Sequence, residues 1–140
     1  MKIVEKTPPR LLKVDPRRII SRHSSSSSRY YKELYELRLF SVIPPIPIVI
    51  APKDLASLGD YINYDGHHRK LSAQEAGVWP ECMLLENDSH IVYLRNFGLK
   101  SDDFLEGCGE SFQEHYDHVC NEARYYQRLK RLARLKGIDF

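Results

Sequence analysis

The apolar residues of this chain fall first in short runs broken by proline and glycine, and then along one long amphipathic stretch. Leu11–Val14, Ile46–Ile50, Tyr61–Tyr64 and Cys82–Leu85 are short aliphatic or aromatic runs, which predicts four strands. Because proline has no N–H to donate to a ladder, Pro47 predicts an edge strand or a position whose nitrogen needs no partner.

Helical spacing appears between these runs. Tyr30–Phe40 has apolar residues on one helical face and predicts a helix. Leu71–Ala76 predicts a second, short helix that ends at Gly77. The pattern over His90–Phe97 fits a strand and a helix equally well.

The last segment, Ser111–Leu135, gives the clearest helical pattern. Its apolar stripe repeats at intervals of three and four and consists of Phe112, Tyr116, Val119, Ala123 and Tyr126. The later leucines, at 129, 132 and 135, drift around the helix axis. The end of this helix therefore either tilts away from the domain or packs against a second copy of the chain in a homodimer.

The order of these elements predicts a compact α/β (α+β) fold, with a mixed sheet, short helices and a long C-terminal helix. We expect residues 1–97 to form the domain and residues 98–140 to form a helical extension packed on it. A chain of 140 residues with 42% hydrophobic and 29% charged residues has the size and composition of one globular domain.

The formal charge of +2 does not argue for a nucleic-acid partner. The charge is unevenly distributed, however, because residues 124–136 contain no acid. Arg124, Arg128, Arg131 and Arg134 lie in this stretch, which is either a DNA-binding surface or a solvated helix end.

Cys82, Cys108 and Cys120 do not have the spacing of a disulfide framework, which favours a reducing, cytoplasmic compartment. The longest apolar run, Val42–Ala51, is interrupted by prolines and is far shorter than the ~20 residues of a membrane span. We therefore expect no membrane partner.

Two further segments bear on a site. Ser24–Ser28 is a run of five serines and predicts a mobile loop, either a lid or a plain connector. Trp79 follows the Gly77 turn, where we expect it to fill the space between helix and strand rather than to stack on a base.

The most chemically informative segment is Asp65-Gly66-His67-His68-Arg69, at the junction of a predicted strand and helix. A strand that turns into a helix exposes free N–H groups at the helix start, which favours an anion. Arg69 can grip phosphate oxygens in a fork, and His67 and His68 can donate hydrogen bonds or act as acid or base. Asp65 can hold Mg²⁺ or accept a proton from a hydroxyl. The alternative is a polar turn whose hydrogen bonds are internal.

The stretch 61–77, YINYDGHHRKLSAQEAG, resembles the ParB N-terminal/sulfiredoxin superfamily. Residues 45–49 (PIPIV) resemble its preceding strand, and residues 12–19 (LKVDPRRI) resemble its opening segment. The resemblance implies a nucleotide site at Gly66, His67, His68 and Arg69, with ATP, ADP or CTP as the ligand and Mg²⁺ at Asp65. The sequence of the turn, residues 65–69, is most similar to that of the free serine kinase branch.

Three functions follow from that resemblance. The first is a small-molecule kinase or nucleotide hydrolase in which Asp65, His67 and His68 are catalytic and a small hydroxylated compound is the substrate. The second is a ParB-like module that binds DNA under nucleotide control. The third is an inactive interaction protein. The kinase branch uses a glutamate in the loop after its first strand, and residues 21–28 contain none. Arg95 also stands where ParB proteins have a glutamate.

Overall fold

The computed structural model describes residues 8–96 and 111–139 and has a mixed α/β architecture. Its five-stranded sheet has the order β1-β5-β3-β4-β2. The strands are β1 (Arg10–Lys13), β2 (Ile19–Ile20), β3 (Ile46–Ile50), β4 (Tyr61–Asn63) and β5 (Glu81–Leu84). The β1–β5 and β3–β4 pairs are antiparallel, whereas β3–β5 and β2–β4 are parallel. The predicted fold class is therefore confirmed.

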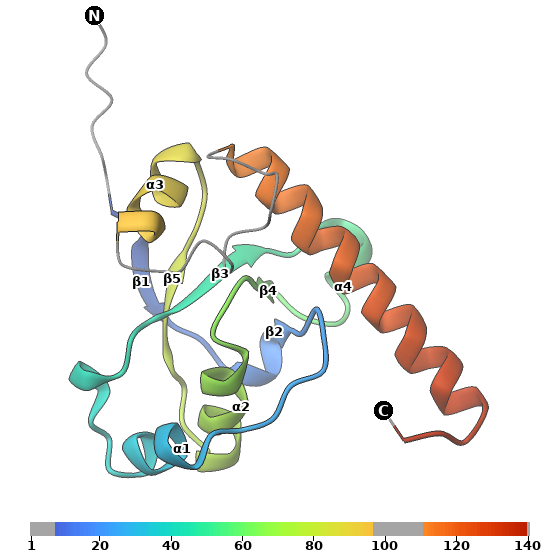
Figure 1. Cartoon of the computed structure of the whole chain (residues 1–140), viewed down its shortest axis with the longest axis horizontal. Coiled ribbons are helices and arrows are strands. Elements are labelled where there is room, and N and C mark those ends of the chain that lie inside the picture. The colour runs from blue at the N-terminus through green and yellow to red at the C-terminus, as the bar shows by residue number, and fades with distance from the viewer. Residues whose placement is uncertain (1–7, 97–110, 140) are drawn as a thin grey trace, which may run out of the picture.

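Four α-helices surround the sheet in the described part of the chain. They are α1 (Arg29–Glu36), α2 (His67–Ala76), α3 (Asp88–Asn96) and α4 (Phe112–Leu135). Figure 1 shows α4 running along one side of the molecule past β4 and β2, with its last turns beyond the sheet. Short 3-10 turns, η1 (Pro16–Arg18), η2 (Phe40–Val42) and η3 (Lys53–Leu55), connect the other elements.

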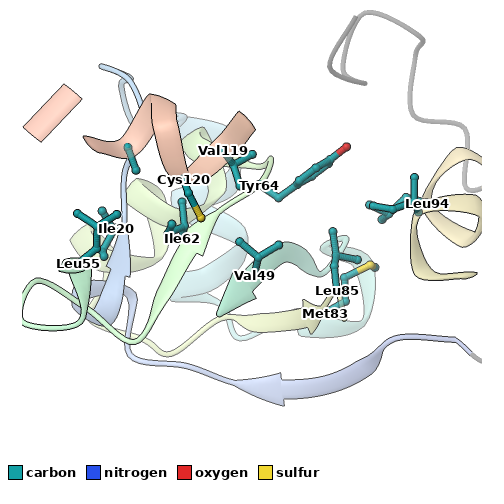
Figure 2. Close-up of a cluster of buried hydrophobic side chains, with 12 residues drawn as sticks. Ile20, Val49, Leu55, Ile62, Tyr64, Met83, Leu85, Leu94, Val119 and Cys120 are labelled. Atoms are coloured by element: carbon teal, nitrogen blue, oxygen red, sulfur yellow. The ribbon is translucent and has the colours of Figure 1, made fainter. Parts of the chain in front are cut away.

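Period-two alternation in the central strands divides the core between the two faces of the sheet. Ile46 and Ile48 face one cluster, and Val49 faces the other. On that second face, Val119 and Cys120 of α4 belong to one cluster with Ile62 of β4, and Cys120 lies over Ile62 (Figure 2). Because α4 supplies residues to the main core, it is part of the fold and not a loosely attached tail.

Three elements differ from the sequence-based prediction or resolve an alternative that it left open. Helix α2 begins at His67, four residues before the apolar pattern that predicted it, because its first turn is built from polar residues. The ambiguous segment 90–97 is helical as far as the structure describes it, in α3. Strand β2 was not predicted, since two residues carry no periodicity.

Pro47 lies in a central strand, so the expected edge position is wrong and the alternative applies. Its carbonyl accepts a hydrogen bond from the Tyr64 N–H at 3.0 Å. The β3–β4 register places Tyr64 opposite Pro47, where an ordinary residue would return a bond from its own N–H. The Tyr64 carbonyl instead accepts from the Arg22 guanidinium at 2.6 Å, which supplies the donor that Pro47 lacks.

The serine run has no regular structure, but hydrogen bonds tie it to α2. The Ser28 N–H donates to the Ser72 hydroxyl at 2.8 Å, and the Ser28 side chain caps α1. Trp79 is 55% exposed, so the expectation that it fills space inside the molecule is wrong. None of the helices in the described ranges is long and apolar enough to span a membrane.

Candidate functional site

The turn from β4 into α2 depends on Gly66. This residue has φ +75°, in the left-handed region, and stands at the N-cap of α2 without a side-chain cap. A Cβ at this position would lie 2.8 Å from the Arg69 guanidinium. Asp65, just before it, is half-buried, and its carbonyl accepts from the Asn63 amide at 2.5 Å. The glycine therefore lets Arg69 fold back across the turn.

Arg69 contacts the backbone that precedes β3. Its Nη1 donates to the carbonyls of Pro44 at 2.5 Å and of Pro45 at 3.0 Å. Prolines have no N–H, so these carbonyls belong to a segment that offers few internal hydrogen bonds. Arg69 therefore holds the Pro44–Pro45 segment against α2, and it does not line the cleft described below.

His68 anchors the serine loop. Its Nδ1 lies 2.6 Å from the Ser26 carbonyl and 3.3 Å from the Ser25 hydroxyl. A carbonyl oxygen only accepts, so Nδ1 carries the proton in the shorter contact. His68 therefore fixes the loop that borders the site.

His67 is buried, and neither of its ring nitrogens has a hydrogen-bond partner. Its ring centroid lies 3.8 Å from that of His23. Burial, followed by the positive charges of His23 and Arg22, lowers the pKa of His67 to about 2. His67 is consequently neutral at physiological pH and does not itself line the cleft described below, which it approaches only through its ring contact with His23. A buried nitrogen without a partner is unusual in a folded protein.

A cleft of about 480 Å³ opens beside this turn, between η1, β2, α2 and the C-terminal half of α4. We call it the cationic cleft and define it by the four basic residues that line it, Arg17, Lys70, Lys130 and Arg134. No aspartate or glutamate is among the residues that line it within the described ranges. Arg17 pairs with the Asp15 carboxylate at 2.9 Å, so Lys70, Lys130 and Arg134 supply most of the positive charge that attracts anions to the cleft.

Lys70 is the most buried of the four. Only 6% of the residue is exposed, and its Nζ donates to the Ser21 hydroxyl at 2.8 Å. It has no ion pair among residues 8–96 and 111–139. Burial, and then the charge of Lys130, lowers its pKa to about 8. An anion in the cleft would compensate both effects at once.

The structure separates several residues that the sequence grouped. Arg124 donates to the Asp54 carboxylate at 2.7 and 3.0 Å, and Arg128 and Arg131 are exposed outside the cleft. Arg134 alone of the four predicted nucleic-acid arginines lines the cleft. Within the turn, His68 borders the serine loop while Arg69 contacts Pro44 and Pro45, so the five residues 65–69 do not converge on one point.

Sequence reasoning missed three of the four basic residues of the cleft. Lys70 lies one turn after His67 on α2, so helical spacing is a signal that would have found it. Lys130 lies in the acid-free stretch 124–136 that the sequence singled out, but Arg17 carries no signal, because only the tertiary structure brings η1 and α4 together. No group of three potential metal-ligating side chains occurs in the part of the chain that the structure describes, and Cys108 lies outside it.

Comparisons with known proteins give no relative: no family model, curated protein or solved structure matches this chain.

Proposed function

We propose that this protein binds a phosphate-bearing ligand, with nucleotides as the first class to test, in the cationic cleft. One observation carries the proposal. Lys70 is a buried ammonium group with a single hydroxyl partner, in a hollow lined by three further cations and no described carboxylate. Buried charges are normally paired, so this arrangement favours a site completed by an anionic ligand.

The serine loop and α2 support the same ligand class. Ser21 and Ser25 present hydroxyls to the cleft, and these can donate to phosphate oxygens. Helix α2 contributes Lys70, Leu71 and Gln74 to the lining of the cleft, whereas residues 66–69 at its start do not line it. Nucleotides come first because the turn 65–69 resembles the phosphate-binding turn of the ParB/sulfiredoxin superfamily, with ATP, ADP or CTP and Mg²⁺ as the corresponding ligands.

The proposal is a binding function. Phosphoryl transfer needs a carboxylate or an equivalent base at the attacking hydroxyl. Among the described residues, Asp65 is not part of the cleft lining. An enzyme built on this site would therefore have to bring Asp65 to the ligand, and single-turnover assays of an Asp65→Asn variant would detect that role.

The test is thermal unfolding with pyrophosphate, ATP, ADP and CTP, each with and without Mg²⁺. A ligand at a hundredfold excess over its dissociation constant stabilises the folded state by about 2.7 kcal/mol. We expect at least one of these ligands to raise the melting temperature of the wild-type protein.

Arg134→Ala and Arg131→Ala form a matched pair for this test. Both remove an exposed arginine from the same helix, but only Arg134 lines the cleft. We expect Arg134→Ala to weaken binding about tenfold, as loss of one charge-assisted contact predicts, and Arg131→Ala to change it less than twofold. Equal effects of the two variants, or no stabilisation by any of the ligands, would overturn the proposal.

A further inference from the structure

Trp79 lines a second hollow beside the cationic cleft. This Trp79 hollow measures about 300 Å³ and is lined by Asp15, Pro16, Arg17, Gln74, Gly77, Val78 and Trp79. More than half of Trp79 is exposed, so its indole contributes little to the core of the described domain. The one basic residue of this hollow, Arg17, is paired with Asp15 at 2.9 Å, and the exposed indole beside it is a surface on which a planar ring can stack.

The hollows share lining residues and therefore adjoin one another. Arg17 and Gln74 line both the cationic cleft and the Trp79 hollow. Gln74 also lines a third hollow of about 560 Å³, which the cationic cleft joins at Ser25 and Leu71. The three hollows therefore lie side by side along the exposed face of α2 and share Gln74, and together we call them the groove.

Aromatic and basic side chains line two of the three hollows, and the groove also contains the carboxylates of Asp15 and Glu75. Trp79 lies in one hollow with Arg17, and Tyr126 lies in the cationic cleft with Lys130, whose Nζ is 5.5 Å from the Tyr126 ring centroid. Single-stranded nucleic acid presents a matching alternation of planar bases and charged phosphates. A duplex keeps its bases stacked inside, and a single nucleotide has too few groups to occupy all three hollows.

We infer that the groove binds single-stranded nucleic acid, with a base stacked on Trp79 and the adjoining phosphates in the cationic cleft. The inference rests on the proposed function, since the phosphates occupy the same cleft. It adds the stacked base, the extended length and the preference for unpaired strands. RNA and DNA share this chemistry, so both are needed as probes.

The chain contains one tryptophan, so its intrinsic fluorescence reports on this position alone. The full chain is titrated at low salt with twelve-nucleotide oligothymidylate and oligouridylate, with thymidine monophosphate and with pyrophosphate. We expect both oligonucleotides to quench Trp79 and to bind at least tenfold more tightly than the monophosphate. Their affinity should fall steeply with salt, with a slope near −0.7 for each phosphate contacted.

A fluorescein-labelled oligothymidylate then measures the variants by anisotropy. We expect Trp79→Ala to weaken binding about tenfold and Trp79→Phe to weaken it less, because phenylalanine retains an aromatic face. Tyr125→Ala is the control, since Tyr125 is an exposed aromatic residue that lines none of the three hollows.

The outcomes separate the two proposals. Nucleotide or pyrophosphate binding that requires Arg134, without tighter binding of oligonucleotides or any effect of Trp79→Ala, would leave the proposed function standing and overturn this inference. Duplex DNA that binds as tightly as the single strand would also overturn it. Absence of binding by all the probes would remove both proposals.

Discussion

The Arg22 guanidinium donates to the backbone carbonyl of Tyr64 at 2.6 Å, on the face of the ladder where Pro47 has no N–H to offer. The same side chain donates to the Asn63 carbonyl at 3.1 Å and pairs with Glu122 of α4 at 2.6 Å. Because only 10% of the Arg22 side chain is exposed, these bonds are shielded from water. One residue thus joins the end of β4 to α4, beside the turn that begins α2.

Replacing Arg22 with alanine should destabilise the fold by about 2 to 4 kcal/mol, because it removes a shielded donor from two backbone carbonyls and leaves the Glu122 carboxylate with His118 alone. Arg22→Lys should recover only part of this loss, since an ammonium group lacks the planar fork. Urea unfolding measures both. Arg29→Ala is the control, because its pair with Glu33 is almost fully solvent-exposed and should change the free energy of unfolding by less than about 0.5 kcal/mol. A loss below 1 kcal/mol for Arg22→Ala would contradict the bridging role.

Gly66→Ala should cost more stability than Gly77→Ala. Both glycines have positive φ, of 75° and 71°, so each substitution carries a similar backbone penalty of about 1 kcal/mol. Only at Gly66 would the added Cβ also meet Arg69, because nothing lies within 4 Å of a Cβ at Gly77. Chemical denaturation of the two variants gives the difference. Equal losses would show that Arg69 moves aside without cost, and the double variant Gly66→Ala/Arg69→Ala separates the two terms.

Stability should depend on pH through Lys70. Its pKa falls from 10.5 in the unfolded chain to about 8 in the folded one, so the unfolded state binds more protons between these values. The cost of burying the charged amine is fully present below pH 8 and is relieved as pH rises towards 10.5. We expect the wild-type protein to gain stability relative to Lys70→Met across this window in denaturation series. A constant difference would mean that Lys70 is not desolvated.

His67 should make the fold sensitive to acid. Its folded-state pKa of about 2 lies below the ordinary value of 6.5, so the unfolded state takes up a proton that the folded state refuses. This contribution to stability is complete above pH 6.5 and is lost as pH falls, by up to about 1.4 kcal/mol per pH unit. His67→Leu should be at least as stable as the wild type at pH 7 and should lack this acid slope. Parallel acid slopes in the two proteins would contradict the prediction.

The strands and the long helix were predictable because their signals are local. Ile46–Ile50 and Ser111–Leu135 each show their period directly, and the structure places β3 and α4 there. The position of β3 in the sheet was not predictable from Pro47. A proline argues for an edge only if no other group supplies the missing donor, and Arg22, 25 residues earlier in the chain, supplies it.

The candidate site shows the same division. The turn at Gly66 was predictable, since a glycine between a strand and a polar helix start is a local signal. The contacts that the neighbouring residues make were not predictable. Arg69 and His68 contact the Pro44–Pro45 segment and the serine loop, while the anion-attracting charges come from Arg17, Lys70 and Lys130. Their convergence depends on how α4 docks, which no short sequence pattern encodes.

Because its basic residues come from separate elements, the cleft exists only while those elements are packed together. Arg17, Lys70 and Lys130 come from three distant parts of the chain, and two of them depend on α4 or η1 reaching α2. Local unfolding of the last turns of α4, beyond its core residues Val119 and Ala123, would dismantle the cleft while the sheet stayed intact. By thermodynamic linkage, an occupied cleft must then slow hydrogen exchange along α4 more than along β1. Ligand binding would in this way hold the C-terminal end of α4 against the domain. That end carries the exposed side chains of Leu132 and Leu135.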